Sequence, residues 1–290
     1  MPAVWPTAQP WDHRHVSGTL FVVGTPIGNL GDMTERARET LASVELVAAE
    51  DTRRTGRLLA RMGIKRRLVS LFEGNERERI GSIVAELREG KDVALVSDAG
   101  MPSISDPGFL LVRACTEEGI EVRVVPGPSA VTAALVVSGL PVDRFTFEGF
   151  LPRKAGERRE RLHSLADDPR TLVLFESPRR LRSLLREVVA ELGDRRVAAA
   201  RELTKLHEEV LRGRASEVLD RLGDADPKGE IVLVVEGRRD EEIPGLDELV
   251  VEATRLVQGG MRKREAASAV ARDRGGSANA IYEALTRSPG

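Results

Sequence analysis

Short apolar runs alternate with longer amphipathic stretches over the first 237 residues of the chain. Runs rich in β-branched residues predict buried strands, which in the first half fall at residues 19–23, 46–49, 68–71, 93–96 and 122–125. Apolar positions at helical spacing predict helices at residues 35–43, 55–62, 76–89, 108–118 and 129–137. Such alternation is typical of a mostly parallel sheet covered by helices, so we predict an α/β fold.

A second block of the same kind follows Ser138-Gly139-Leu140-Pro141, which we interpret as a helix end and a domain boundary. Its predicted strands are residues 145–150, 171–175, 197–200 and 231–235, and its predicted helices are residues 155–166, 179–192 and 215–222. Residues 201–209 form a polar stretch. We therefore expect two α/β domains, at residues 18–140 and 141–237, followed by an acidic linker.

The two ends of the chain differ from this pattern. Residues 246–257, 263–272 and 278–285 predict three short helices, separated by glycine pairs, in a small module at residues 246–288. Two short helices joined by a glycine-containing turn resemble a helix-turn-helix unit, and a plain three-helix packing module explains the pattern almost as well. Residues 1–17 are rich in Pro and Trp and lack the apolar core of a signal peptide, so we expect a disordered extension there.

Composition limits the class of protein. With 41% apolar and 31% charged residues, most of the 290-residue chain is expected to fold into globular units. The single Cys115 excludes a disulfide framework and is most simply a small buried apolar residue, which fits a reducing, cytoplasmic location. The chain holds no apolar run of the roughly 20 residues that cross a bilayer.

The formal charge of −2 conceals several basic clusters. One lies between Arg53 and Arg67 and contains no acidic residue, and others occur near residues 153–161, 179–186 and 262–274. Any one cluster is most simply a solvated helix face, but several on a near-neutral protein favour a polyanionic partner such as RNA. The residues that we predict to contact RNA are Arg53, Arg54, Arg57, Lys263 and Arg264.

Several common catalytic motifs are missing from the sequence. It contains neither a Walker phosphate loop nor a Gly-x-Gly-x-x-Gly fingerprint after the first predicted strand, which argues against P-loop and Rossmann nucleotide binding. Its four His and one Cys show no metal-ligand spacing, and it has no Gly-x-Ser-x-Gly nucleophile elbow. Ser129 is more simply a helix N-cap than a nucleophile.

What the sequence does contain is a set of shaped loops at predicted strand ends. Residues 24–29 (GTPIGN), 97–108 (SDAGMPSISDPG) and 125–130 (VPGPSA) each follow a predicted strand. Glycine lets main-chain groups approach a ligand and proline fixes the loop. Because open α/β sheets bind ligands at the carboxyl ends of their strands, the loops predict a small-molecule site for a nucleotide-like ligand.

The order of these and later motifs resembles the tetrapyrrole-methylase-like family of S-adenosylmethionine methyltransferases. Within it, the match is to the branch that methylates ribose 2′-hydroxyls of bacterial small-subunit ribosomal RNA. Besides the three loops, the matching segments are residues 49–53 (AEDTR), 175–179 (FESPR), 201–209 (RELTKLHEE) and 229–230 (GE). Tetrapyrrole-modifying members usually open with Gly-x-Gly-Pro-Gly, whereas residues 24–28 here are GTPIG, which favours the RNA branch.

The resemblance implies two α/β domains with S-adenosylmethionine in the cleft between them, a homodimer, and no metal. The implied reaction is methyl transfer to a cytidine 2′-hydroxyl in the decoding region of 16S rRNA. The positions that match the cofactor motifs are Pro26, Leu30, Asp98, Gly100, Pro102, Ile104, Ser105, Gly127, Ser129, Ala130, Phe175, Glu176, Leu203 and Gly229.

An alcohol has a high pKa, so a proton acceptor or a charged group is expected beside the reacting oxygen. The candidates are Glu176, Lys205, Arg201 and Glu202, with Glu50 and Asp51 as alternatives; Lys205 would act as a base only if its pKa were depressed. Two other functions stay open: C-methylation of a tetrapyrrole, and RNA binding without catalysis.

Overall fold

The computed structural model describes residues 17–223, 228–238, 246–274 and 277–287. The extension predicted at residues 1–17 lies outside them apart from Ser17, and so does most of the predicted linker. No described helix is long and apolar enough to span a membrane.

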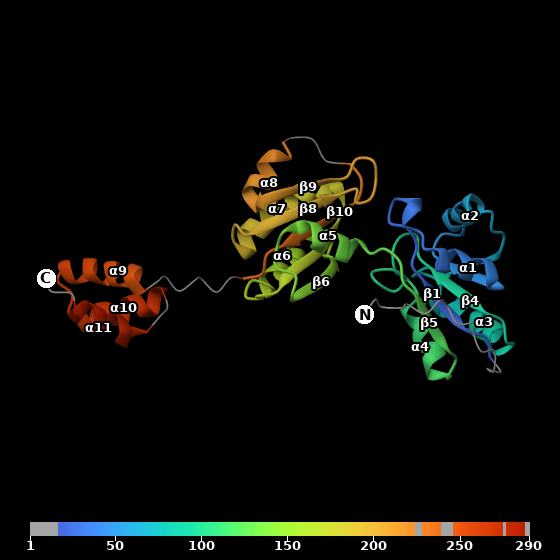
Figure 1. Ribbon diagram of the computed structural model, residues 1–290, viewed down its shortest axis with the longest axis horizontal. Coiled ribbons are helices and arrows are strands. Elements are labelled where there is room, and N and C mark those ends of the chain that lie inside the picture. The colour runs from blue at the N-terminus through green and yellow to red at the C-terminus, as the bar shows by residue number, and fades with distance from the viewer. Residues whose placement is uncertain (1–16, 224–227, 239–245, 275–276, 288–290) are drawn as a thin grey trace, which may run out of the picture.

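The first domain is a parallel five-stranded sheet between two layers of helices (Figure 1). The strands, in the order β3-β2-β4-β1-β5, are β1 (Leu20–Val23), β2 (Leu46–Ala49), β3 (Arg67–Ser70), β4 (Val93–Val96) and β5 (Val122–Val125). Helices α1 (Glu35–Ser43) and α2 (Thr52–Arg61) pack on one face, and α3 (Glu76–Arg88) and α4 (Phe109–Glu117) pack on the other. Successive residues of a strand point to opposite faces, so Leu95 enters one core and Val96 the other. Cys115 is fully buried, as predicted.

The second domain has a mixed sheet in the order β6-β7-β10-β8-β9. Its strands are β6 (Phe145–Phe150), β7 (Thr171–Glu176), β8 (Arg196–Arg201), β9 (Glu209–Arg214) and β10 (Ile231–Val235). Only β6 and β7 pair in parallel, so the expectation of a mostly parallel sheet is wrong for this domain. Strands β7 and β8 do run in the same direction, but β10 lies between them and is antiparallel to both.

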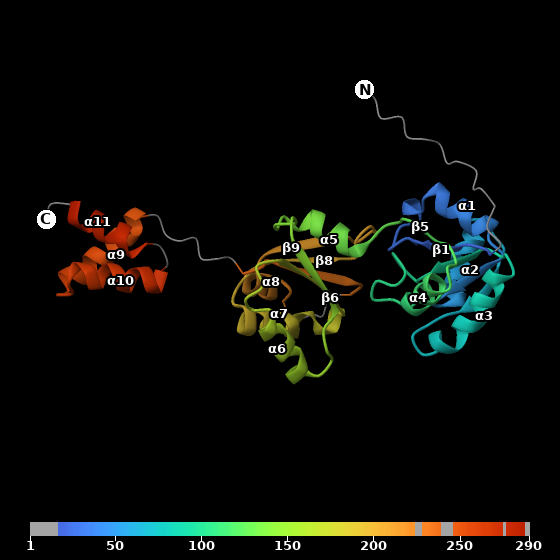
Figure 2. The same cartoon turned by 90° about the horizontal axis from the view of Figure 1, so that it is seen from below.

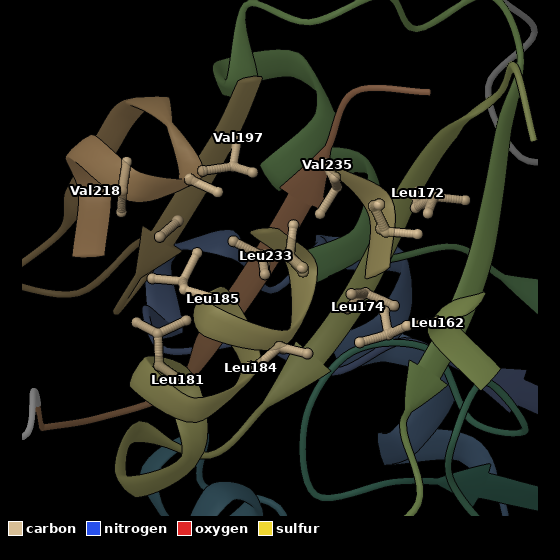
Figure 3. Close-up of a cluster of buried hydrophobic side chains, with 14 of the residues drawn as sticks. Leu162, Leu172, Leu174, Leu181, Leu184, Leu185, Val197, Val218, Leu233 and Val235 are labelled. Carbon is tan, nitrogen blue, oxygen red and sulfur yellow. The ribbon is translucent and has the colours of Figure 1, made fainter. Parts of the chain in front are cut away.

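Helices cover both faces of the second sheet. Helices α6 (Ala155–Ser164), α7 (Pro178–Leu192) and α8 (Ala215–Arg221) enclose a leucine-rich core, in which Leu181, Leu184 and Leu185 of α7 meet Leu174 and Leu233 of the sheet (Figure 3). Helix α5 (Ala130–Ser138) packs on the opposite face. The boundary predicted at residue 140 places this helix in the first domain, whereas its apolar side chains pack in a core with the sheet of the second domain.

Three C-terminal helices form a group of their own (Figures 1 and 2). They are α9 (Leu246–Gln258), α10 (Lys263–Arg274) and α11 (Ala278–Arg287), close to the predicted positions. Their buried residues, among them Leu249, Ala266 and Ile281, form a hydrophobic cluster separate from those of the two sheet domains. The helices therefore have a core that does not depend on either sheet.

Candidate active site

The three shaped loops of the first domain are fixed to one another at the carboxyl edge of its sheet. Thr25 and Gly100 exchange two backbone hydrogen bonds, of 2.8 and 3.0 Å, and the Thr25 hydroxyl donates to the Ser97 carbonyl at 3.1 Å. The backbones of Gly24 and Gly127 cross so closely that neither position has room for a Cβ atom. The loops after β1, β4 and β5 consequently form one rigid wall.

A cavity of about 400 Å³ separates this wall from the second domain. Its lining contains most of the predicted cofactor positions: Gly100, Ile104, Ser105, Ser129, Ala130, Phe175, Glu176, Leu203 and Gly229. The structure thus brings together residues far apart in sequence and from both domains, as expected for a cleft site. A volume of this size suits a ligand of nucleotide dimensions.

Five predicted cofactor positions do not line the cavity: Pro26, Leu30, Asp98, Pro102 and Gly127. Asp98 is engaged within the first domain, where its carboxylate accepts hydrogen bonds from the Asp51 N–H at 3.2 Å and from Arg54 at 3.0 Å. Gly127 lines a neighbouring groove. For these residues the cofactor role remains a prediction from motif position alone.

The lining also contains residues that the motif match did not single out. Ile27, Asp106 and Glu230 belong to segments quoted above, so the motifs marked their loops but not their side chains. Phe150, at the end of β6, has no sequence signal beyond its strand. Its ring packs edge-on against Phe175, with 5.5 Å between ring centroids, which gives the cavity an aromatic wall.

Asp106 is the acidic residue of the first domain that lines the cavity. Burial raises the pKa of its carboxyl group to about 6, and the negative charges of Glu50 and Asp98 add to this effect against a hydrogen bond from Ser97. Desolvation and like charges both disfavour the ionised form. Asp106 therefore exchanges a proton near pH 6 and lines the cavity.

Glu176 supplies a second carboxyl group, at the end of β7. It is only 3% exposed, and its Oε1 accepts hydrogen bonds from the Ser177 N–H at 2.6 Å and from the Ser177 hydroxyl at 3.2 Å. Its Oε2 lies 3.1 Å from an Arg180 nitrogen but has no hydrogen bond of good geometry from the described residues. A buried oxygen in this state favours a cationic or hydrogen-bonding ligand in the cavity.

Lys205 connects the two domains beside the cavity. A Cβ atom on Gly28 would lie 2.5 Å from Lys205 Cγ, so the first loop passes directly against this side chain. The ammonium group donates to Glu202 at 2.9 Å and to Glu230 at 3.1 Å. Burial alone would lower the pKa of Lys205, but the two carboxylates outweigh it and raise that pKa above its ordinary value. Lys205 is thus held charged, contrary to what a proton acceptor requires.

The other catalytic candidates have structural partners outside the cavity lining. Arg201 pairs with Glu209 at 3.0 Å, and Glu202 accepts from Lys205, which lowers the pKa of Glu202. Asp51 caps helix α2 by accepting from the Arg53 N–H at 2.8 Å, and Glu50 accepts from the Asp98 N–H at 3.2 Å. Asp106 and Glu176 are left as the better-placed acidic groups.

Comparison with known proteins identifies the family to which the chain belongs. The sequence model of the tetrapyrrole (corrin/porphyrin) methylases matches residues 19–219. This chain belongs to that family.

Its similar relatives include two that share the name ribosomal RNA small subunit methyltransferase I. The one from Thermotoga maritima is 54% identical over 221 residues, which are 76% of this chain and 99% of the relative. The one from Escherichia coli O157:H7 is 46% identical over 272 residues, covering 92% of this chain and 94% of the relative. This chain is therefore a methyltransferase of the ribosomal RNA branch of its family.

Solved structures agree on the fold. The uroporphyrin-III-C-methyltransferase from Thermus thermophilus is 25% identical, with a TM-score of 0.52 over 76% of this chain and 94% of that one. The methyltransferase CobJ is 21% identical, with a TM-score of 0.58 over 77% of this chain and 97% of that one, and shows the fold alone. About three quarters of this chain thus shares the fold of these solved methyltransferases.

The predicted RNA-contacting residues of this methyltransferase lie on the surface. The Arg53 side chain is 86% exposed and pairs with Asp51, and Arg57 is exposed on the same helix. In the C-terminal helices, the Lys263 ammonium donates to the Leu285 carbonyl at 2.8 Å, and Arg264 lies 5.9 Å from the centre of the Tyr282 ring. The residues that the structure describes contain no group of three or more His, Cys, Asp or Glu suited to a metal ion.

Proposed function

We propose that this protein transfers the methyl group of S-adenosylmethionine to the ribose 2′-hydroxyl of a cytidine in the decoding region of 16S rRNA. The observation that carries the proposal is the cavity of about 400 Å³ that both domains line with acidic and aromatic residues. It occurs in a chain that is 54% and 46% identical to proteins named ribosomal RNA small subunit methyltransferase I.

The cavity fits this methyl donor. S-adenosylmethionine combines a flat adenine ring with two cationic groups, a sulfonium and an ammonium. Phe175 and Ile104 supply apolar walls for the ring, while Glu176 and Glu230 supply carboxyl groups for the cations. When bound, the donor supplies a methyl group on a positively charged sulfur, which is a good leaving group.

The chain's own contribution is position and proton handling. Rigid loops fix the reactants, and most of the rate is expected from that alignment. As the new carbon–oxygen bond forms and the sulfur–carbon bond breaks, the hydroxyl proton must leave. We assign the proton acceptor to Asp106, because it lines the cavity and its pKa is about 6, near the working pH. Lys205 is not assigned this role, because it is held in its charged form by ion pairs with Glu202 and Glu230.

The basic surface supports an RNA substrate. Helix α2 begins at Thr52, directly after β2 ends at Ala49, so its arginines start at the edge of the sheet where the cavity lies. Exposed arginines at such a place neutralise phosphates while the ribose enters the site. The C-terminal helices add exposed Lys263 and Arg264 as further phosphate contacts.

The test uses methyl-labelled donor with two acceptors, undermodified small ribosomal subunits and uroporphyrinogen. We expect label on a single cytidine ribose of the RNA and none on the tetrapyrrole. Label on the tetrapyrrole would favour the alternative reaction, and RNA binding without donor binding would make the protein a non-catalytic factor. The homodimer implied by the family resemblance is measured in the same preparation by light scattering.

A further inference from the structure

A second hollow adjoins the cavity. This groove, of about 690 Å³, lies between the loop after β1, the start of α5 and the turn after β8. Ile27, Ser129 and Leu203 line both hollows, so the two hollows are neighbours that share these residues. A molecule in the groove and a donor in the cavity would therefore contact the same three residues.

Two buried polar atoms in the groove lack a partner. Asp32 Oδ2 and Thr204 Oγ1 are inaccessible to solvent and have no hydrogen bond from the described residues, and both residues line the groove. Leaving such atoms unsatisfied costs about 1–3 kcal/mol each, so two residues with unpaired atoms in the lining of one groove favour a polar ligand there.

Local structure fixes both residues. Asp32 ends the short helix η1 (Leu30–Asp32), which Asn29 caps by accepting from the Gly31 N–H at 2.9 Å. Thr204 has a left-handed backbone (φ 67°), held by a hydrogen bond of 2.7 Å from its N–H to Glu208. A β-branched residue in this conformation is strained, and such strain is retained where the fold requires the side chain in one place.

The chemistry of the groove selects its ligand. A carboxylate only accepts hydrogen bonds, whereas a threonine hydroxyl both donates and accepts. Val136, which is 79% exposed, and Val137 supply apolar wall, and the described lining contains no Lys or Arg. Phosphate is thus disfavoured, and a flat ring that carries an amino group is favoured.

We propose that the groove receives the base of the target nucleotide and that Asp32 accepts a hydrogen bond from its exocyclic amino group. The Thr204 hydroxyl donates to an acceptor on the same edge of the base. The inference rests on the proposed function and deepens it, since an amino group distinguishes cytosine from uracil, whose oxygen at that position would face the carboxylate.

The test compares two small-subunit RNAs, with cytidine or uridine at the methylated position, in single-turnover reactions. Asp32→Asn and Thr204→Val keep the shape of each side chain, and Glu35→Gln, a 70% exposed carboxylate nearby, is the control. We expect each variant to lower the cytidine rate about tenfold, and Asp32→Asn to reduce the cytidine preference, with the control unchanged. Calorimetry should show wild-type affinity for S-adenosylmethionine in all three proteins.

Two results would overturn this inference. One is a wild-type rate and a wild-type cytidine preference in both groove variants, with RNA methylation by the parent protein intact. The other is conversion of a dimer into a monomer by Val136→Asp, which would make the groove an interface between copies. If the parent protein methylates neither RNA, the proposed function itself fails, so the two failures are distinguishable.

Discussion

A Cβ atom built on Gly24 would lie 2.6 Å from the backbone nitrogen of Gly127, so the loops after β1 and β5 touch through their main chains. We expect Gly127→Ala to force these loops apart. The cost is about 1–3 kcal/mol of stability, with at least a roughly tenfold loss of methyl-donor affinity because the cavity wall moves. Thermal unfolding and calorimetry measure the two effects.

The matched control is Gly81→Ala in helix α3, where a Cβ atom meets nothing within 4 Å. Alanine is the better helix former, so this variant should be more stable by about 1 kcal/mol and bind the donor normally. If Gly127→Ala and Gly81→Ala had the same stability and the same donor affinity, the close contact between the Gly24 and Gly127 backbones would not be needed for the site.

Asp106 predicts a pH dependence of the chemical step. At donor concentrations well below saturation, where the free protein sets the profile, the methylation rate should rise as pH passes through about 6, where the carboxyl group ionises, and then level off. Asp106→Asn should lower the rate and abolish that rise. A rate profile in Asp106→Asn with the wild-type inflection would assign the titration to another group.

Asp106 also predicts a pH dependence of stability, which runs opposite to that of the rate: stability falls where the rate rises. The pKa of Asp106 is raised to about 6 from the model-compound value of 3.8, so between these values the folded state binds more protons than the unfolded state. Its contribution to the free energy of unfolding therefore falls as pH rises through this window. The free energies of unfolding of wild type and Asp106→Asn, measured by urea titration, should agree at the acid end, diverge as pH rises from 3.8 to about 6, and stay a constant distance apart above it, with the variant more stable.

Lys205→Ala removes the cation shared by Glu202 and Glu230. We expect a loss of roughly 1 kcal/mol of stability, because the Lys205 and Glu202 side chains are 26% and 19% exposed and the ion pair is partly screened. Since the pKa of Lys205 is raised, its charge is present throughout the neutral range, and the loss should not change with pH there. Lys154→Ala, which breaks an ion pair between side chains that are 81% and 54% exposed (Lys154 and Glu157), should cost almost nothing.

Arg57→Ala tests the basic face of α2. Removing one phosphate contact should weaken RNA binding for all sequences and reduce the slope of log affinity against log salt by about one. Arg113→Ala in α4, which packs on the opposite face of the sheet, is the control. Filter binding at several salt concentrations gives both slopes, and identical slopes would remove α2 from the RNA interface.

The C-terminal helices predict a separable function. Because 221 residues make up 99% of the Thermotoga maritima relative, that protein is too short to match both sheet domains and these helices. A chain ending at Arg238 should keep its donor affinity within about twofold, since the cavity lining comes from the sheet domains, and should bind RNA more weakly. Loss of donor binding in that chain would contradict an independent module.

The sequence reveals strands where burial demands a continuous apolar run, and β4 is the plainest case, because Val93–Val96 is buried on both faces. Strand β9 was missed for the opposite reason. It is an edge strand with Glu209, Arg212 and Arg214, and charged side chains are tolerated there because one side faces solvent. The antiparallel insertion of β10 depends on contacts between distant segments that no local pattern records.

The site shows a similar division. The motif at residues 97–108 marks a ligand loop and contains both Asp98 and Asp106. Only packing decides that Asp98 faces the start of α2 while Asp106 faces the cavity. Motif position finds the loop, and the direction of each side chain follows from the tertiary fold.

Strand β10 is buried at every residue and lies in the middle of its sheet, although it is the last strand along the chain. During synthesis, β7 can pair with β6 and β8 with β9, but the two halves of the sheet can join only after β10 has been made, because β10 pairs with both β7 and β8. Ile231 and Val232 of this strand also line the cavity. A nascent chain therefore has no binding site for its methyl donor until translation has passed the second domain.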